Sequence, residues 1–250
     1  MSHRPSNLFT NPPRLPLVAP SILSADFARL RDDCAHVLDV AAGDLLHVDV
    51  MDGHFVPNLT MGPAIVRSLR AALPEAFLDV HVMVTDPIQY VKPFAASGAN
   101  HLTFHVEPAL DPLAGAGMSP LSGGGAGYDP LELVEEIHAA GMTAGLAINP
   151  GTSAETVLAQ PGWVEAMDLI LVMSVWPGFS GQAFIPEVLA TAKAIKPKLG
   201  PNQRLEMDGG LGPETAIPAR EAGVDVLVAA SAVFGQPPSE RAEAIRAIRG

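Results

Sequence analysis

The amino-acid sequence predicts an α/β fold, a (β/α)₈ barrel of eight parallel strands surrounded by helices. Length, composition and the order of apolar segments support this prediction. The chain has 250 residues, a common size for one such domain. It is 48% hydrophobic and 17% charged with few aromatic residues, which suits a sheet that is buried on both faces. Eight apolar runs separated by helical segments complete the pattern.

The eight runs are short, mostly rich in β-branched residues, and bounded by Gly, Pro or Asp, as strands should be. They are Leu15–Leu23, Leu45–Met51, Phe77–Val84, His101–Val106, Thr143–Ile148, Leu169–Val175, Arg204–Met207 and Val224–Ala229. Repeated strand–helix units imply a parallel sheet, and eight of them imply its closure. The structural alternative is an open sheet, which usually has a Gly-rich turn after its first strand if it binds a dinucleotide. This chain reads Pro20-Ser21-Ile22-Leu23 at that place, which argues against a dinucleotide-binding fold.

Local signals mark the helix boundaries. Asp86-Pro87 predicts a helix cap followed by Pro in the first turn, and Thr152 with Glu155 matches a capping box. At four joints between a helix and the next strand we expect Gly to end the helix in the left-handed conformation. These joints are Ala42-Gly43, Ser97-Gly98, Ala140-Gly141 and Ala222-Gly223.

Two segments lie outside the strand–helix pattern. Residues 1–16 are rich in Pro, Asn and Ser and have no apolar signal core, so we expect a disordered lead-in to a single domain over residues 17–250. Residues 111–129 contain six glycines and two prolines without a period. This composition favours a flexible surface insertion, with a mobile lid over the catalytic face as the alternative.

The net charge of −12 argues against a nucleic acid or an anionic membrane as partner. No apolar run reaches membrane-spanning length. The single cysteine, Cys34, cannot form an intrachain disulfide, so nothing requires an oxidising compartment. We therefore expect a cytoplasmic protein, a homo-oligomer, whose partner is a small molecule.

Polar residues near the ends of three predicted strands carry the chemistry, because barrel active sites gather at the carboxyl ends of strands. Side chains of a strand alternate, so His47 and Asp49 share a face with Met51, and His81 shares one with Met83. Asp208 ends the seventh strand, and Met173 lies on the sixth. Buried His and Asp side chains are costly unless they are paired or bound. Their convergence predicts a divalent-metal site with ligands that suit Zn²⁺, Fe²⁺, Mn²⁺ or Co²⁺.

The two carboxylates also suggest a reaction. The second and seventh strands are nearly opposite in a ring of eight, so Asp49 and Asp208 would flank a bound substrate. Inversion of a carbon requires one group that removes a proton from one face and another that delivers a proton to the opposite face. One carboxylate must then be ionised and the other protonated, and the pair should titrate as a coupled unit.

Glycine-rich loops after the sixth and seventh strands predict a phosphate site, because glycine lets backbone N–H groups approach an anion. Backbone donors also explain how an acidic protein could hold phosphate. The residues of this predicted site are Gly178, Phe179, Ser180, Gly181, Gly209, Gly210, Ala230 and Ser231.

These motifs resemble those of ribulose-phosphate 3-epimerases, and the resemblance runs from about Val18 to Phe234, interrupted by the Gly-rich insertion. It implies a TIM barrel of the ribulose-phosphate-binding type. It also implies an isomerase of the pentose phosphate pathway that interconverts D-ribulose 5-phosphate and D-xylulose 5-phosphate. The motifs that carry it are Pro20-Ser21-Ile22-Leu23, Leu46 to Asn58, Asp79 to Val84, Pro177 to Gln182 and Glu206 to Gly210.

The resemblance implies a role for each of the candidate site residues. It implies one divalent metal ion on His47, Asp49, His81 and Asp208, with Asp49 as proton acceptor and Asp208 as proton donor. By the same match Ser21 and His81 contact the substrate, the glycine loops surround its phosphate, and Met51, Met83 and Met173 lie over an enediolate. The expected reaction is epimerisation at C3 by two-base proton transfer, with the metal as Lewis acid.

Some residues depart from the family pattern, and they leave alternatives open. Ala230 and Ser180 stand where the family usually has Gly, and Trp176 stands where a polar residue is more usual. The alternatives are a D-allulose 6-phosphate 3-epimerase, a metal-dependent sugar-phosphate decarboxylase, and a non-catalytic phosphosugar-binding barrel. No catalytic-face Lys supports the decarboxylase, and the four retained ligands argue against the binding protein.

Overall fold

The computed structural model describes residues 8–110 and 127–250, and their central feature is one parallel sheet. Its eight strands follow the order β1-β8-β7-β6-β5-β4-β3-β2. Each strand falls on one of the apolar runs, and β7 extends one residue beyond its run. The strands are β1 (Leu17–Pro20), β2 (Leu46–Met51), β3 (Leu78–Met83), β4 (His101–His105), β5 (Thr143–Ile148), β6 (Leu169–Met173), β7 (Arg204–Asp208) and β8 (Val226–Ala229).

The two end strands of this sheet, β1 and β2, meet through a single parallel bridge between Ser21 and His47. The bridge closes the barrel, which confirms the predicted architecture. It also places the residue that follows β1 directly beside the first polar residue of β2.

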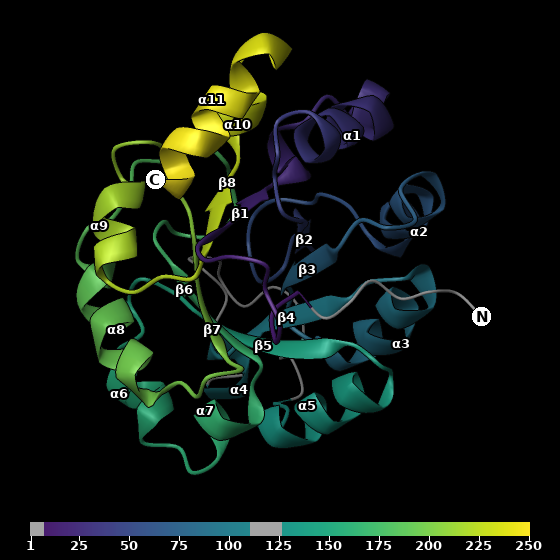
Figure 1. The fold of residues 1–250 in the computed structure, drawn as a ribbon. Coiled ribbons are helices and arrows are strands. Elements are labelled where there is room, and N and C mark those ends of the chain that lie inside the picture. The colour runs from purple at the N-terminus through teal and green to yellow at the C-terminus, as the bar shows by residue number, and fades with distance from the viewer. Residues whose placement is uncertain (1–7, 111–126) are drawn as a thin grey trace.

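The helices form a ring outside the strands (Figure 1). They are α1 (Leu30–Asp39), α2 (Pro63–Ala72), α3 (Ile88–Ser97), α4 (Glu107–Leu110), α5 (Pro130–Ala139), α6 (Ala154–Leu158), α7 (Trp163–Ala166), α8 (Val188–Ile195), α9 (Ala216–Glu221), α10 (Ser231–Phe234) and α11 (Pro238–Arg249). Short 3₁₀ helices occupy Ile22–Ser24, Phe27–Arg29 and Lys196–Lys198.

The core has two parts because strand side chains alternate between faces. Outward side chains such as Val48 and Val50 pack with helix residues under the outer ring. Inward side chains such as Leu171 and Val226 form a second cluster inside the barrel. Polar residues share this inward parity in β2, β3 and β7, so the barrel interior is apolar on one side and polar on the other.

The helix-boundary signals were partly right. Gly98, Gly141 and Gly223 have positive φ of 90°, 81° and 89°, as expected. At the first joint, however, Ala42 rather than Gly43 is left-handed, with φ of 61°. Gly43 is instead close-packed, because an added Cβ would lie 3.0 Å from Pro20 Cγ and from Val37 O.

The two cap predictions were wrong in detail. Helix α6 has Ser153 as its N-cap, because the hydroxyl of Thr152 instead donates to Glu107 Oε1 at 2.6 Å. Helix α3 has Pro87 at the N-cap without a side-chain cap from Asp86.

The lead-in prediction does not hold for the described residues 8–16. Phe9 is fully buried, and its ring packs edge-on against Phe77 and His101 with centroid separations of 4.9 and 4.8 Å. This segment therefore fills the end of the barrel where the strands begin. Burial of the apolar ring of Phe9 stabilises this segment on the barrel although the residues around it are mostly polar.

The Gly-rich insertion over 111–129 lies mostly outside the described residues, but its last residues belong to the fold. Tyr128 is buried and donates a hydrogen bond to the carbonyl of His105. Asp129 is the N-cap of α5, and its side chain accepts a hydrogen bond from Leu131 N.

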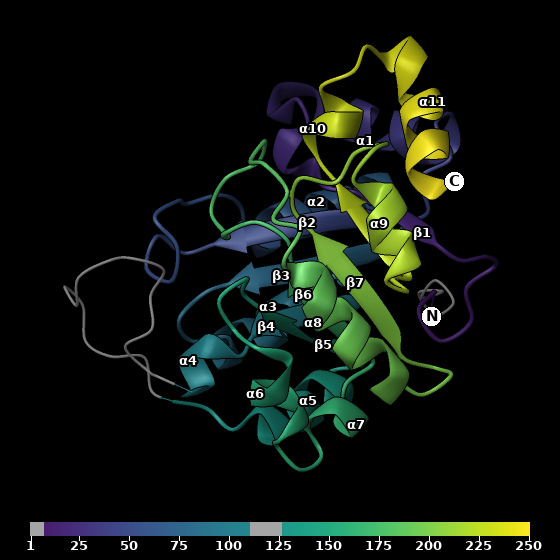
Figure 2. The same ribbon diagram turned by 90° about the vertical axis from the view of Figure 1, so that its left-hand side faces the viewer.

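The carboxyl ends of the strands carry the loops that matter for function. In Figure 2 the loops after β2 and β6 lie together on the side toward which the arrowheads of β2 and β3 point, opposite the N-terminal segment. Asn58 Nδ2 joins these loops by donating to Gly178 O at 2.8 Å. None of the helices in the described residues has the length and apolar character needed to cross a membrane.

Candidate active site

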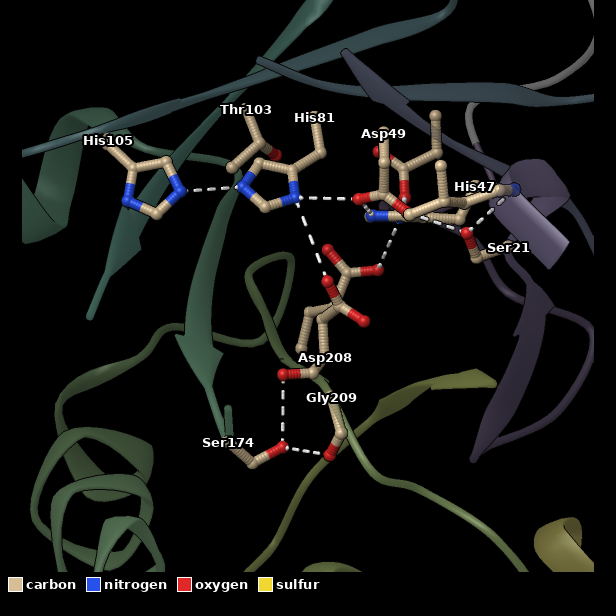
Figure 3. Close-up of polar contacts among 12 residues, drawn as sticks. Ser21, His47, Asp49, His81, Thr103, His105, Ser174, Asp208 and Gly209 are labelled. Carbon is tan, nitrogen blue, oxygen red and sulfur yellow. Dashed lines mark hydrogen bonds and ion pairs between the residues drawn. The ribbon is translucent and has the colours of Figure 1, made fainter. Parts of the chain in front are cut away.

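Four side chains converge at the carboxyl end of the barrel. His47 and Asp49 come from β2, His81 from β3 and Asp208 from β7, and one ligand atom from each lies within 4.8 Å of the others. The register explains the convergence, because Asp49 pairs with His81 across β2 and β3. The structure thus brings together the four residues that the sequence pattern predicts as metal ligands (Figure 3).

The contacts within this cluster are short. Asp49 Oδ1 lies 3.3 Å from His47 Nε2 and 3.2 Å from His81 Nδ1, and Asp208 Oδ2 lies 3.8 Å from His81 Nδ1. Both histidines are fully buried, and the side chain of Asp208 is 13% exposed. His47 Nε2 is buried without a hydrogen-bond partner among the described residues. An orphaned imidazole nitrogen beside two carboxylates is a donor set that fits a divalent cation.

A second layer of buried acids lies behind His47. Asp79 Oδ2 is 2.7 Å from His47 Nδ1, and Glu206 Oε1 is 3.7 Å from the same nitrogen. A carboxylate on the far nitrogen of a histidine is the usual partner of a metal-binding imidazole. The sequence prediction missed this role for both acids. Strand alternation could have indicated it. Each acid stands two residues before a predicted ligand on the same strand, so its side chain also points into the barrel.

The two candidate acid–base groups differ in protonation. Burial raises the pKa of Asp49, but the positive charge of His47 outweighs burial and holds this pKa well below its usual range. Burial and the negative charge of Asp49 raise the pKa of Asp208 to about 7. In the metal-free cluster, Asp49 therefore favours its ionised form and Asp208 favours its protonated form.

The two histidines also differ. Burial disfavours the charged form of His47, but Asp49 and Asp79 outweigh it and raise its pKa well above the ordinary value. Burial lowers the pKa of His81 to about 4, so His81 is neutral near pH 7. In the absence of a bound cation, His47 rather than His81 therefore favours the positively charged form beside Asp49 and Asp79.

Ser21 adds a further contact to Asp49. Its buried hydroxyl donates to Asp49 Oδ2 at 2.6 Å, which leaves Oδ1 facing the histidines. The predicted substrate residue Ser21 thus reaches the site through the carboxylate.

A cavity of about 490 Å³ opens over the cluster. Its lining includes both candidate acid–base carboxylates and all of the predicted methionine and phosphate-loop residues. These are Asp49, Met51, Met83, Met173, Gly178, Phe179, Ser180, Gly181, Asp208, Gly209, Gly210, Ala230 and Ser231. Ser21, His47 and His81 are not among the lining residues, because they lie deeper than the carboxylates that they contact.

The loop after β7 requires its glycines. Gly209 has φ of 119°, and an added Cβ would lie 2.8 Å from Val175 N. Gly210 has φ of 62°, and an added Cβ would lie 2.6 Å from Phe184 N. Close backbone approach between the loops after β6 and β7 therefore excludes a side chain at either position.

Ser174 holds this loop in place and was not among the predicted residues. Its hydroxyl hydrogen-bonds Gly209 O at 2.6 Å and Asp208 O at 3.0 Å, and its backbone N–H donates to Asp208 O at 2.7 Å. The backbone that carries Asp208 is therefore tied to the end of β6.

Comparison with known proteins gives consistent matches. A family model described as the ribulose-phosphate 3 epimerase family matches residues 17–116 and 126–234. The chain is 41% identical over 232 residues to the cytoplasmic isoform of ribulose-phosphate 3-epimerase from Oryza sativa subsp. japonica. The aligned region covers 93% of this chain and 92% of the relative. It is 43% identical over 237 residues to ribulose-phosphate 3-epimerase from Mycobacterium tuberculosis, with coverage of 94% and 92%.

Solved structures show the same fold at low sequence identity. 3-Hexulose-6-phosphate synthase from Salmonella typhimurium has a TM-score of 0.62 at 14% identity, with 93% of this chain and 96% of that chain covered. Phosphoribosyl anthranilate isomerase from Thermotoga maritima has a TM-score of 0.59 at 16% identity, with the same coverage.

Proposed function

This chain belongs to the ribulose-phosphate 3-epimerase family, and we propose that it interconverts D-ribulose 5-phosphate and D-xylulose 5-phosphate by proton transfer at C3. The observation that carries the mechanism is the pair Asp49 and Asp208. These carboxylates reach one cavity from β2 and β7, and their pKa values are shifted in opposite directions.

In this mechanism the ionised Asp49 removes the C3 proton from one face of the substrate, and the protonated Asp208 delivers a proton to the other face. The roles reverse in the opposite direction of reaction. General acid–base chemistry of this kind needs a base and an acid that are in the correct states at the same pH. The downward shift of the Asp49 pKa and the upward shift of the Asp208 pKa support that division.

The residues that would hold the metal are His47, Asp49, His81 and Asp208. The orphaned Nε2 of His47 supports this assignment, as does the Asp79 carboxylate on its Nδ1. A bound divalent cation would supply positive charge that stabilises the enediolate formed when C3 loses its proton. The nitrogen and oxygen donors suit Zn²⁺, Fe²⁺, Mn²⁺ and Co²⁺ alike.

The remaining lining residues bind and shield the substrate in this proposal. Met51, Met83 and Met173 are each at most 2% exposed, and they give the reacting carbon an apolar wall that keeps water away. The loops after β6, β7 and β8 would hold the phosphate through backbone N–H groups. The backbone donors explain why an overall charge of −12 is compatible with an anionic substrate.

Turnover tests this function directly. Purified protein should epimerise ribulose 5-phosphate faster than allulose 6-phosphate, with metal content determined on the same sample. Faster turnover of the six-carbon substrate would assign the chain to the alternative epimerase. Binding of both sugars without turnover by metal-loaded protein would instead indicate a phosphosugar-binding barrel. A homo-oligomeric state and a cytoplasmic location stay predictions.

A further inference from the structure

A line of polar side chains continues from His81 away from the metal cluster. His81 Nε2 lies 2.8 Å from His105 Nε2, and the two rings stack with centroids 5.0 Å apart. His105 Nδ1 lies 3.0 Å from Glu107 Oε2. His105 ends β4 and is 1% exposed. Figure 3 shows His81 between His105 and Asp49. Neither His105 nor Glu107 is among the predicted site residues, and neither lines the cavity.

The hydrogen bonds of Glu107 fix the direction of this line. Its Oε1 accepts from the backbone N–H of Asn149 at 2.7 Å and from the hydroxyl of Thr152 at 2.6 Å. An ionised carboxylate only accepts hydrogen bonds, so His105 Nδ1 must donate to Oε2. A neutral His105 then has a lone pair on Nε2, and the proton in the contact with His81 belongs to His81.

His81 has one proton and two contacts that could take it. Its Nε2 faces His105 and its Nδ1 faces Asp49 Oδ1 at 3.2 Å. A proton on Nδ1 would leave two lone pairs facing each other in the 2.8 Å contact with His105. With the proton on Nε2, the Nδ1 lone pair faces the carboxylate oxygens of the cluster, which is an arrangement that a shared cation accommodates.

We propose that His105 and Glu107 are positioning residues that hold His81 as its Nε2-protonated tautomer, so that its Nδ1 lone pair is available to the metal. This inference rests on the metal site of the proposed function. His47 has the opposite orientation, because its Nδ1 hydrogen-bonds Asp79 and its Nε2 faces the cluster. The two histidines thus present different nitrogens, and each requires its own outer partner.

An imidazole at position 105 has a physical advantage over a carboxylate in direct contact with His81. Asp49, Asp79, Glu206 and Asp208 already crowd the polar side of the barrel. An imidazole accepts the hydrogen bond from His81 Nε2 without placing a further negative charge beside these acids, while Glu107 lies one ring further away.

Glu107→Gln tests the proposal, because the surroundings dictate how the amide must lie. The N–H of Asn149 can only donate, so the amide oxygen faces it and the NH₂ group faces His105. His105 Nδ1 must then accept, its proton moves to Nε2, and His81 becomes protonated on Nδ1 at the metal cluster. We expect zinc affinity, measured by competition with a chromogenic chelator, to fall by about 10–100-fold. The matched control is Thr152→Val, which removes one contact to Oε1 and leaves Oε2 on His105. We expect wild-type affinity.

The tautomers themselves provide the readout that a merely structural role would not change. ¹⁵N NMR of histidine-labelled, metal-free protein should show His105 protonated on Nδ1 in the wild type and in Thr152→Val, and on Nε2 in Glu107→Gln. A wild-type His105 protonated on Nε2 would overturn the proposal, as would unchanged zinc affinity in a Glu107→Gln protein whose His105 has switched. An enzyme that epimerises its substrate with either result keeps the proposed function. A wild type with the expected tautomers that binds no divalent ion would instead remove the metal on which both depend.

Discussion

Asp49 and His81 are direct register partners on β2 and β3, and Asp49 Oδ1 lies 3.2 Å from His81 Nδ1. The same carboxylate accepts a hydrogen bond from Ser21 on its other oxygen at 2.6 Å. Closure of the barrel between Ser21 and His47 is therefore what assembles the site, because it brings β1 against β2 at the level of Asp49.

Removal of the metal is expected to abolish turnover. The cluster buries two acids and two histidines, and His47 Nε2 has no hydrogen-bond partner among the described residues. A chelator should eliminate activity, and a divalent ion should restore it and raise the melting temperature, since an ion that binds only the folded state stabilises it. Full activity in a preparation shown to be free of metal would contradict this expectation.

The two phosphate-loop positions Gly209 and Ala230 should respond differently to substitution. Gly209→Ala places a Cβ 2.8 Å from Val175 N at φ of 119°, so we expect a loss of about 1–3 kcal/mol in unfolding free energy and a higher KM. Ala230→Gly should change KM modestly and kcat little, because backbone N–H groups do not depend on the side chain. Steady-state kinetics and denaturant unfolding measure both. A large gain in kcat for Ala230→Gly would favour a different natural substrate.

A pH-dependent contribution to stability is expected from His138 and Asp168, whose side chains lie 2.8 Å apart. The hydrogen bond that His138 Nε2 donates to Asp168 raises the pKa of His138 above the ordinary 6.5, so the folded state binds this proton more tightly. This contribution is complete below pH 6.5 and is lost as the pH rises through the raised pKa. Because His138 is substantially exposed, we expect His138→Gln to cost only about 0.5 kcal/mol at pH 5.5 and less at pH 9. An equal cost at both pH values would refute the linkage.

The sequence alone predicted the convergence of the four candidate ligands because strand parity is a local property. His47, Asp49, His81 and Asp208 each stand near a strand end with inward parity, and closure of the barrel brings such positions together. Asp79 and Glu206 also have inward parity, two residues deeper in the barrel. Nothing in the local sequence, however, shows whether such an acid contacts His47 or only forms part of the barrel wall.

Residues whose role depends on contacts between distant segments escaped prediction. Glu107 holds His105 with one oxygen and a loop 42 residues later with the other, so nothing near Glu107 in the chain reveals its function. The same loop takes Thr152 away from the predicted capping box. Phe9 lies in a polar segment, and only the open end of the barrel gives it a site to fill. Tertiary contacts override local signals in all of these cases.

The proposed division of labour between Asp49 and Asp208 predicts that Asn at either position nearly abolishes epimerisation. Asn preserves the shape of the side chain but cannot transfer the proton on its face. Loss of a general acid or base typically costs about 10²–10⁴-fold in rate. Both carboxylates are also candidate ligands, so metal content must be determined on each variant beside its kcat. Full activity of either metal-loaded variant would show that its carboxylate does not transfer the proton.

Hydrogen exchange at C3 separates the two carboxylates where the rate of epimerisation cannot. In D₂O the surviving carboxylate of each metal-loaded variant should still deprotonate the epimer whose C3 proton faces it, exchange with solvent and return deuterium to the same face. Asp49→Asn and Asp208→Asn should therefore label opposite epimers without inverting them, which NMR of the recovered sugar phosphates can follow. The reason is geometric, because the two side chains reach the cavity from strands separated by β1 and β8. If both variants label the same epimer, a single base serves both faces, and the opposed pKa shifts of Asp49 and Asp208 reflect burial and charge in the cluster rather than a division of catalytic roles.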